Sequence, residues 1–267
     1  MNENLIRLGL LDEDDIILDE AALSLALLDH EDVDPEPYRA LLGAISDRLA
    51  VVGQGATTAQ GRAEALAQVL GDEFGFGGDR ETYDDPANAD LIRVLDRRQG
   101  LPVSLSILYV GAARRIGWQA DALDVPGHVV VMVGAEAAPV IVDPFRNGVR
   151  IDRDAFAALV TASKPGPAAA VSHIAAMPNR AILVRLLLNQ ATRAEQAGQG
   201  KRALVLFMRM TAMAPEYGHA WWERARLHLV DGDVAASRSS LSAMLEITRD
   251  PELRRRVTDL LGSLPAA

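Results

Sequence analysis

Residues 99–145 read QGLPVSLSILYVGAARRIGWQADALDVPGHVVVMVGAEAAPVIVDPF, and this stretch decides the fold. Pro102 suits the first position of a helix, and Gly117 suits its end. Between them, apolar residues recur with helical spacing at Leu105, Leu108, Ala112 and Ile116. The runs 128–134 and 139–143 are rich in β-branched residues and a short loop separates them, which predicts an antiparallel hairpin. We therefore expect an α+β fold in which one helix packs on a small antiparallel sheet.

The rest of residues 1–162 is expected to build around this centre. A weaker strand is predicted over 118–125, and the Asn147-Gly148 pair predicts a tight turn into another extended segment. Residues 1–18 are expected to be a short acidic lead-in. Capping acids, Asp-Pro pairs and apolar spacing predict helices over 19–28 (capped by Asp19), 34–52, 62–73, 86–98 and 152–162.

The C-terminal third shows a different organisation. Residues 163–172, SKPGPAAAVS, are typical of a linker because they contain two prolines and a glycine. The sequence then becomes helical, with similar residues 34 positions apart: Gly198 and Gly232, Ala203 and Ser237, Phe207 and Leu241, Met210 and Met244. This spacing is typical of tetratricopeptide repeats. We expect an α+β domain over 1–162, a linker over 163–175 and an all-α repeat module over 176–267.

Composition limits the classes of function. The net charge of −10 argues against nucleic acid as a partner, because such binding depends on clustered Lys and Arg. The run Arg254-Arg255-Arg256 is short and is predicted to be a solvated helix face. No apolar run is long enough for a membrane span, and the first thirty residues do not resemble a secretory signal, so we expect a cytoplasmic protein without a membrane partner. The histidines show no paired ligand spacing, so neither a metal nor a cofactor is expected.

His128 and Asp143 are the candidate site residues, because each lies at an end of a predicted strand. A carboxylate that accepts a hydrogen bond from one imidazole nitrogen fixes the tautomer and leaves the other nitrogen free as a base. With a nucleophile at the start of the helix at Pro102, this layout is that of a cysteine-protease-like site. The chain, however, contains no cysteine. A purely structural interpretation stays open, in which His128 is a turn residue and Asp143 caps the strand end.

Two dense blocks, RRQGLPVSLSILY and PGH…VDPF, resemble the SirB-one family. Its members pair a transglutaminase-like domain with C-terminal tetratricopeptide repeats, so the resemblance implies that fold for nearly the whole chain. It also implies that His128 stands at the catalytic His position and Asp143 at the catalytic Asp position. The family's nucleophilic Cys would lie at the start of the Pro102 helix, where Ser104 is the first residue with a nucleophilic side chain.

Two functions follow as hypotheses. The first is a non-catalytic, degenerate transglutaminase-like protein that binds a protein or peptide partner in a regulatory role. The alternative is a serine-dependent hydrolase or acyl transferase that uses Ser104, His128 and Asp143. A serine lacks the ionised population of a cysteine and needs a well-placed base and an oxyanion hole. The two hypotheses therefore differ in whether a serine hydroxyl lies within hydrogen-bond reach of His128 in an open cleft.

Overall fold

The computed structural model describes residues 3–135, 138–161 and 175–265. The chain forms two compact units: residues 13–183 form the larger, and residues 1–12 together with 184–267 form the smaller. These units differ from the predicted domains, because the first residues group with the C-terminal helices and residues 175–183 group with the larger unit. Of the predicted linker over 163–175, residues 163–174 lie outside the described residues.

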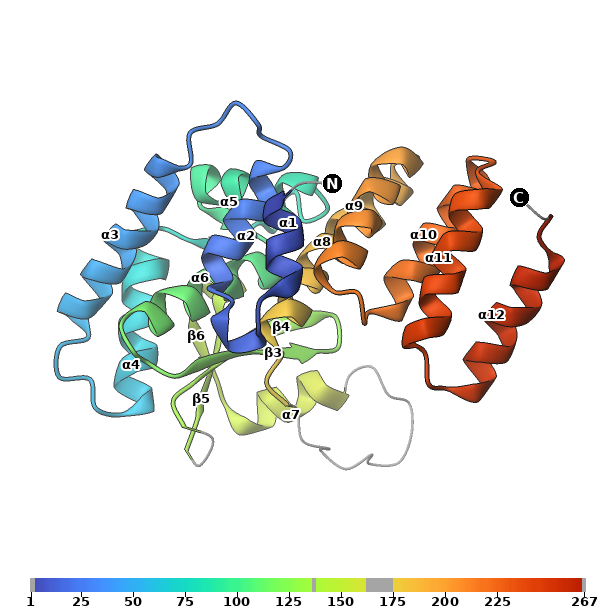
Figure 1. Ribbon diagram of the computed structural model, residues 1–267. Helices are drawn as coiled ribbons and strands as arrows, with labels where there is room; N and C mark the ends of the chain where they lie inside the picture. The colour runs from blue at the N-terminus through green and yellow to red at the C-terminus, as the bar shows by residue number, and fades with distance from the viewer. Residues whose placement is uncertain (1–2, 136–137, 162–174, 266–267) are drawn as a thin grey trace. The chain divides into compact units, whose positions relative to one another are not determined.

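Helix α6 (Pro102–Arg115) and a four-stranded sheet form the centre of the larger unit (Figure 1). The other helices and single turns lie around them, in chain order η1 (Glu13–Asp15), α2 (Leu18–Leu27), α3 (Glu36–Val52), α4 (Ala59–Leu66), η2 (Ala67–Glu73), η3 (Pro86–Ala89), α5 (Leu91–Arg97), η4 (Pro144–Arg146) and α7 (Arg153–Thr161). Helix α6 is buried from Pro102 to Ala113, which makes it the core of the unit. The predicted helix at Pro102 is confirmed.

The sheet is antiparallel with the order β3 (Ala120–Val125), β4 (His128–Val133), β5 (Val140–Asp143) and β6 (Val149–Ile151). The predicted hairpin of β4 and β5 is confirmed, with Val131 opposite Val142. A separate two-stranded parallel sheet joins β1 (Gly77–Gly78) to β2 (Gln99–Gly100). The α+β class therefore holds for this unit.

The two faces of the sheet have different covers. On one face, Leu123, Val130 and Met132 form a buried cluster with side chains of α7. Because successive side chains of a strand alternate between faces, Val129 and Val131 lie on the other face from Val130, and β4 packs on α6. The same alternation places His128 on the α7 side, since it lies two residues before Val130.

Asp19 does not cap α2, in contrast to the prediction. The helix begins at Leu18 with Ile17 at its N-cap, and no side chain caps it. Asp19 is instead buried, and its Oδ2 accepts a hydrogen bond from Nε of Arg115 on α6 at 2.7 Å. A charge-assisted bond to a residue 96 positions away has replaced the local cap.

The smaller unit is helical, and its elements are α1 (Glu3–Leu10), α8 (Asn179–Gln196, in this unit from Val184), α9 (Gly200–Met213), α10 (Gly218–Val230), α11 (Val234–Ile247) and α12 (Pro251–Ser263). The expected acidic lead-in contains α1, whose Leu5 and Leu8 are buried and which packs on α9. Gly198 and Gly232 have positive φ in the turns before α9 and α11. The equivalent positions in the 34-residue spacing are buried: Ala203, Phe207, Met210, Ser237, Leu241 and Met244. The tetratricopeptide assignment itself stays a prediction.

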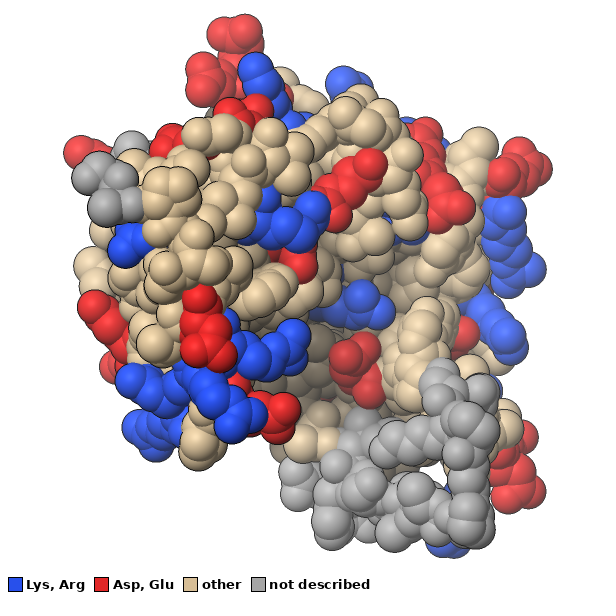
Figure 2. Space-filling model, turned by 90° about the vertical axis from the view of Figure 1, so that its right-hand side faces the viewer, with Lys and Arg blue, Asp and Glu red and all other residues tan. Residues whose placement is uncertain are grey.

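Charge on the smaller unit is mixed in sign. The exposed Arg255 and Arg256 lie on α12 with the acidic Glu252 and Asp259. Arg254 donates to the carbonyl oxygens of Leu245 and Thr248, at the end of α11. On the face shown in Figure 2, basic and acidic side chains are interspersed. Among the described helices, none is long and apolar enough to cross a membrane.

Candidate functional site

His128 and Asp143 contact each other as the sequence predicts. The Pro126-Gly127 turn, in which Gly127 has positive φ, brings His128 to the first position of β4. Asp143 ends β5, and its Oδ1 lies 2.9 Å from Nε2 of His128. Asp143 is 3% exposed, and its Oδ1 also accepts the backbone N–H of Phe145 at 3.0 Å. The pair is therefore held by two strand ends and one backbone hydrogen bond.

The Asp143 carboxylate determines which ring nitrogen of His128 donates a hydrogen bond. An ionised carboxylate only accepts hydrogen bonds, so Nε2 of His128 is the nitrogen that donates to Asp143. Nδ1 has no hydrogen-bond partner among the described residues. The ring also meets Phe145 edge to face, with centroids 6.0 Å apart, and Phe145 meets Tyr83 in the same way. The orientation of His128 is thus fixed on two sides, while one nitrogen stays available.

Arg146 joins this pair, although the sequence analysis did not single it out. It lies in the single turn η4 directly after β5, and its Nε lies 3.5 Å from Oδ2 of Asp143. Its side chain is 68% exposed. Its position in the block VDPFRNG, three residues after Asp143, was the only signal, since a 3-10 turn brings residues i and i+3 to the same side.

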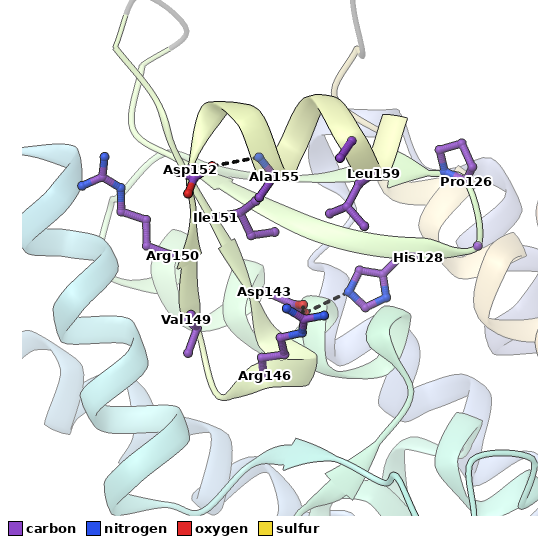
Figure 3. Close-up of a pocket in the computed structure, with 12 residues that line it drawn as sticks. Pro126, His128, Asp143, Arg146, Val149, Arg150, Ile151, Asp152, Ala155 and Leu159 are labelled. Atoms are coloured by element: carbon purple, nitrogen blue, oxygen red, sulfur yellow. Dashed lines mark hydrogen bonds and ion pairs between the residues drawn. The ribbon is translucent and has the colours of Figure 1, made fainter. Parts of the chain in front are cut away.

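A pocket of about 610 Å³ opens beside the pair, between the sheet and α7 (Figure 3). Its volume falls within the range of small-molecule and peptide side-chain sites. The polar residues His128, Asp143 and Arg146 lie at one side of it, and apolar side chains form much of the remainder. The lining residues are Pro126, Gly127, His128, Asp143, Arg146, Val149, Arg150, Ile151, Asp152, Ala155, Ala158 and Leu159.

Ser104 does not share this pocket. It is fully buried on α6, and its hydroxyl donates to the backbone carbonyl oxygen of Asn88 at 2.7 Å. His128 and Asp143 lie on the face of the sheet that α7 covers, whereas α6 packs on the other face. Ser104 is not among the residues that line the pocket. The structure therefore brings together two of the three predicted site residues.

An ion-pair network holds the loop that carries Tyr83. Asp79 is buried and accepts hydrogen bonds from the Thr82 hydroxyl at 2.5 Å and from Arg97 at 2.8 Å. The Thr82 hydrogen bonds, with further help from Asn88 and Arg97, hold the pKa of Asp79 well below its usual value. Tyr83 contacts Phe145, and Phe145 contacts His128. The network therefore helps to hold the His128 ring in place through these two aromatic contacts.

Other kinds of site find little support. Among the described residues, no group of three His, Cys, Asp or Glu side chains could hold a metal ion. His30 forms a second His–carboxylate pair, with Nε2 2.6 Å from Oδ2 of Asp90. Asp90 also caps α5 by accepting the backbone N–H of Arg93, so this pair joins the loop after α2 to the start of α5.

The chain is similar in sequence to several known proteins. The UPF0162 protein of Xylella fastidiosa strain 9a5c is 26% identical over 244 residues, which cover 90% of this chain and 87% of that protein. The UPF0162 protein of Vibrio cholerae is 32% identical over 129 residues, 47% of each chain. F-box only protein 21 of Mus musculus is 33% identical over 93 residues, which are 32% of this chain and 15% of that protein.

The match to a protein family covers α6, the sheet and the pocket. A model described as transglutaminase-like superfamily matches residues 36–188, more than half of the chain. This range contains Ser104, His128 and Asp143. The chain belongs to the transglutaminase-like superfamily.

Proposed function

We propose that this chain is a non-catalytic, degenerate transglutaminase-like protein that binds a protein or peptide partner at the His128–Asp143 pocket and acts in regulation. The observation that carries the proposal is a mismatch within the site. The base and its carboxylate are paired at 2.9 Å beside a pocket of about 610 Å³, yet the chain has no cysteine to complete them. A shaped, partly apolar pocket without a nucleophile is suited to binding.

Acyl transfer needs a nucleophile within hydrogen-bond reach of the base. In the alternative, a serine-dependent hydrolase or acyl transferase, Ser104 would have to give that hydrogen bond to His128. Its hydroxyl instead donates to Asn88 inside the core. This contact supports the non-catalytic interpretation over the alternative.

The smaller unit is the second part of the proposal. We assign its helices to a tetratricopeptide-repeat module of the SirB-one type, which would add a surface for partners. The support is the 34-residue spacing together with the burial of its equivalent positions, such as Phe207 and Leu241. The turn glycines Gly198 and Gly232 lie at matching places between helices.

The proposal is tested by capturing partners from a lysate of the source organism on the intact chain. Ala158→Phe fills the pocket, because Ala158 lines it and is exposed. Arg153→Phe is the matched control on the same helix, since Arg153 is exposed but does not line the pocket. We expect a protein that the wild type and the control retain and that Ala158→Phe loses. Equal retention by all three baits would contradict partner binding at this pocket.

A further inference from the structure

The pocket contains a guanidinium whose hydrogen-bonding capacity is unused. Arg146 forms an ion pair with Asp143 at 3.5 Å but makes no hydrogen bond with any described residue. A guanidinium presents five N–H donors in a planar fork that matches a carboxylate. Figure 3 shows the Arg146 side chain directed toward the His128–Asp143 pair, whereas Arg150 points away from it. Arg146 and Arg150 both line the pocket, and Arg146 is the one that lies beside the His128–Asp143 pair.

His128 is a second pocket-lining residue with an unused polar atom, in this case an acceptor. Because Nε2 of His128 donates to Asp143, Nδ1 of the neutral imidazole carries a lone pair. Nδ1 has no partner among the described residues, and His128 lines the pocket. A complementary ligand would therefore carry an N–H group that donates to Nδ1, close to the negatively charged group that pairs with Arg146.

The rest of the wall is apolar and partly open. Val149 and Ile151 lie on the same side of β6, since strand side chains alternate, and Ile151 packs with the cluster beneath α7. Val149 is 58% exposed and lines the pocket, so part of the apolar wall is open to solvent. Leu159 of α7 lines the same cavity. An aliphatic group placed here would remove apolar surface from water, at roughly 25 cal/mol per Å².

We infer that the pocket binds the C-terminal residue of a polypeptide whose last side chain is aliphatic. The terminal carboxylate pairs with Arg146, the last backbone N–H donates to Nδ1 of His128, and the side chain lies on Val149, Ile151 and Leu159. This inference rests on the proposed function and names the kind of partner. The Asp143 charge is compensated by His128, Arg146 and the Phe145 N–H, so it does not leave a bare anion facing the ligand carboxylate.

Two related ligands lack one part of this pattern each. A peptide with an amidated C-terminus keeps the N–H and the side chain but loses the negative charge. A fatty acid such as octanoate keeps the carboxylate and an apolar chain but has no N–H for Nδ1. A free peptide C-terminus is the ligand that satisfies the donor, the acceptor and the apolar wall together.

The test is fluorescence polarisation with the intact chain and a fluorescein-labelled hexapeptide ending in Ser-Gly-Leu with a free carboxylate. Loss of a charge-assisted pair is worth about 1.5–3 kcal/mol, so the amidated peptide should bind roughly 10- to 100-fold more weakly. Equal affinity of the free and amidated peptides would overturn the inference. Octanoate that binds while neither peptide does would also overturn it, in favour of a lipid-type ligand.

Variants then test whether the terminal carboxylate of the peptide pairs with Arg146. Arg146→Gln should weaken the free peptide by the same roughly 10- to 100-fold and leave the amidated peptide unchanged. Arg153→Gln is the matched control, because it removes the same charge from an exposed arginine of α7 that does not line the pocket, and its expected change is below about twofold. A larger loss in Arg153→Gln than in Arg146→Gln contradicts the inference. Circular dichroism establishes that each variant is folded.

The same samples separate this inference from the proposed function. After incubation, mass spectrometry shows whether the peptide is still intact. Binding without cleavage supports both claims. Binding followed by His128-dependent cleavage refutes the non-catalytic function while the recognition of a C-terminus stands, whereas absence of binding refutes the inference alone.

Discussion

The hydroxyl of Ser104 donates to the backbone carbonyl oxygen of Asn88, 2.7 Å away, inside the core of the larger unit. The same oxygen accepts the backbone N–H of Leu101 at 3.0 Å, so the turn η3 closes over the start of α6. The Ser104 hydroxyl thus has a structural partner in Asn88, while His128 is hydrogen-bonded to Asp143. Ser104 is therefore engaged with Asn88 and does not line the pocket that contains His128 and Asp143.

A thiol placed at the start of α6 should be unreactive. Ser104→Cys would be the only cysteine in the chain, so any thiol adduct reports on this position. Because the side chain is fully buried, we expect iodoacetamide to modify it only after denaturation. Intact-protein mass spectrometry follows the reaction. Rapid modification of the folded variant would show that this position reaches an open site.

A methyl group at Gly78 should disturb the pocket by displacing Phe145. A Cβ there would lie 2.4 Å from the ring of Phe145, which contacts His128 and donates its N–H to Asp143. We expect Gly78→Ala to lower the free energy of unfolding by about 1–3 kcal/mol and to weaken peptide binding. Gly43→Ala is the control, because no atom lies within 4 Å of its Cβ in α3, and it should stabilise the protein by about 0.5–1 kcal/mol. Chemical denaturation measures both.

The Asp79 network should contribute to acid sensitivity. Its folded-state pKa is depressed, so its stabilisation is fully present above the unfolded pKa of about 4 and is lost as the pH falls below that value. Asp79→Asn should cost about 2–3 kcal/mol at pH 7 and flatten the loss of stability between pH ~5 and ~2. Glu81→Gln, an exposed change in the same loop, should stay within about 0.5 kcal/mol. An unchanged acid dependence in Asp79→Asn would contradict this role.

His228 in the smaller unit should also make the protein less stable as the pH falls. Burial and the nearby Arg224 lower its pKa, and its Nε2 is buried without a hydrogen-bond partner among the described residues. The folded state therefore keeps this imidazole neutral, while the unfolded chain gains a proton below about pH 6.5. Stability should fall from pH 7.5 to 5.5, and His228→Leu should reduce that fall. Urea unfolding at pH 7.5 and 5.5 measures this fall in stability for the wild type, for His228→Leu and for the control variant His219→Gln. An equal fall in the wild type and His228→Leu would contradict the role of His228.

Local patterns explain what the sequence predicted well. The helix from Pro102, the hairpin of β4 and β5, and the meeting of His128 with Asp143 depend on periodicity, turn residues and strand ends within about 45 residues. The helix capped by Asp152 is of the same kind, since its Oδ1 accepts the backbone N–H of Ala155.

Long-range contacts explain what the sequence did not predict. Asp19 has the residue type of a cap, but its partner Arg115 lies on a helix whose approach no local pattern reveals. Ser104 has the position of a nucleophile, and only the packing of η3 shows that its hydroxyl is engaged. The apolar wall of the pocket depends on α7 folding over the sheet, which brings Leu159 into the same lining as His128.

In the proposed function, the His128–Asp143 pocket binds its partner without any covalent bond to the protein. The most direct measurement is intact-protein mass spectrometry of the whole chain after incubation with a fluorophosphonate probe, beside His128→Ala. We expect the unmodified mass for both proteins, because the Ser104 hydroxyl is buried and bound to Asn88. An adduct mapped to Ser104 in the wild type and absent from His128→Ala would contradict the account and identify a serine hydrolase.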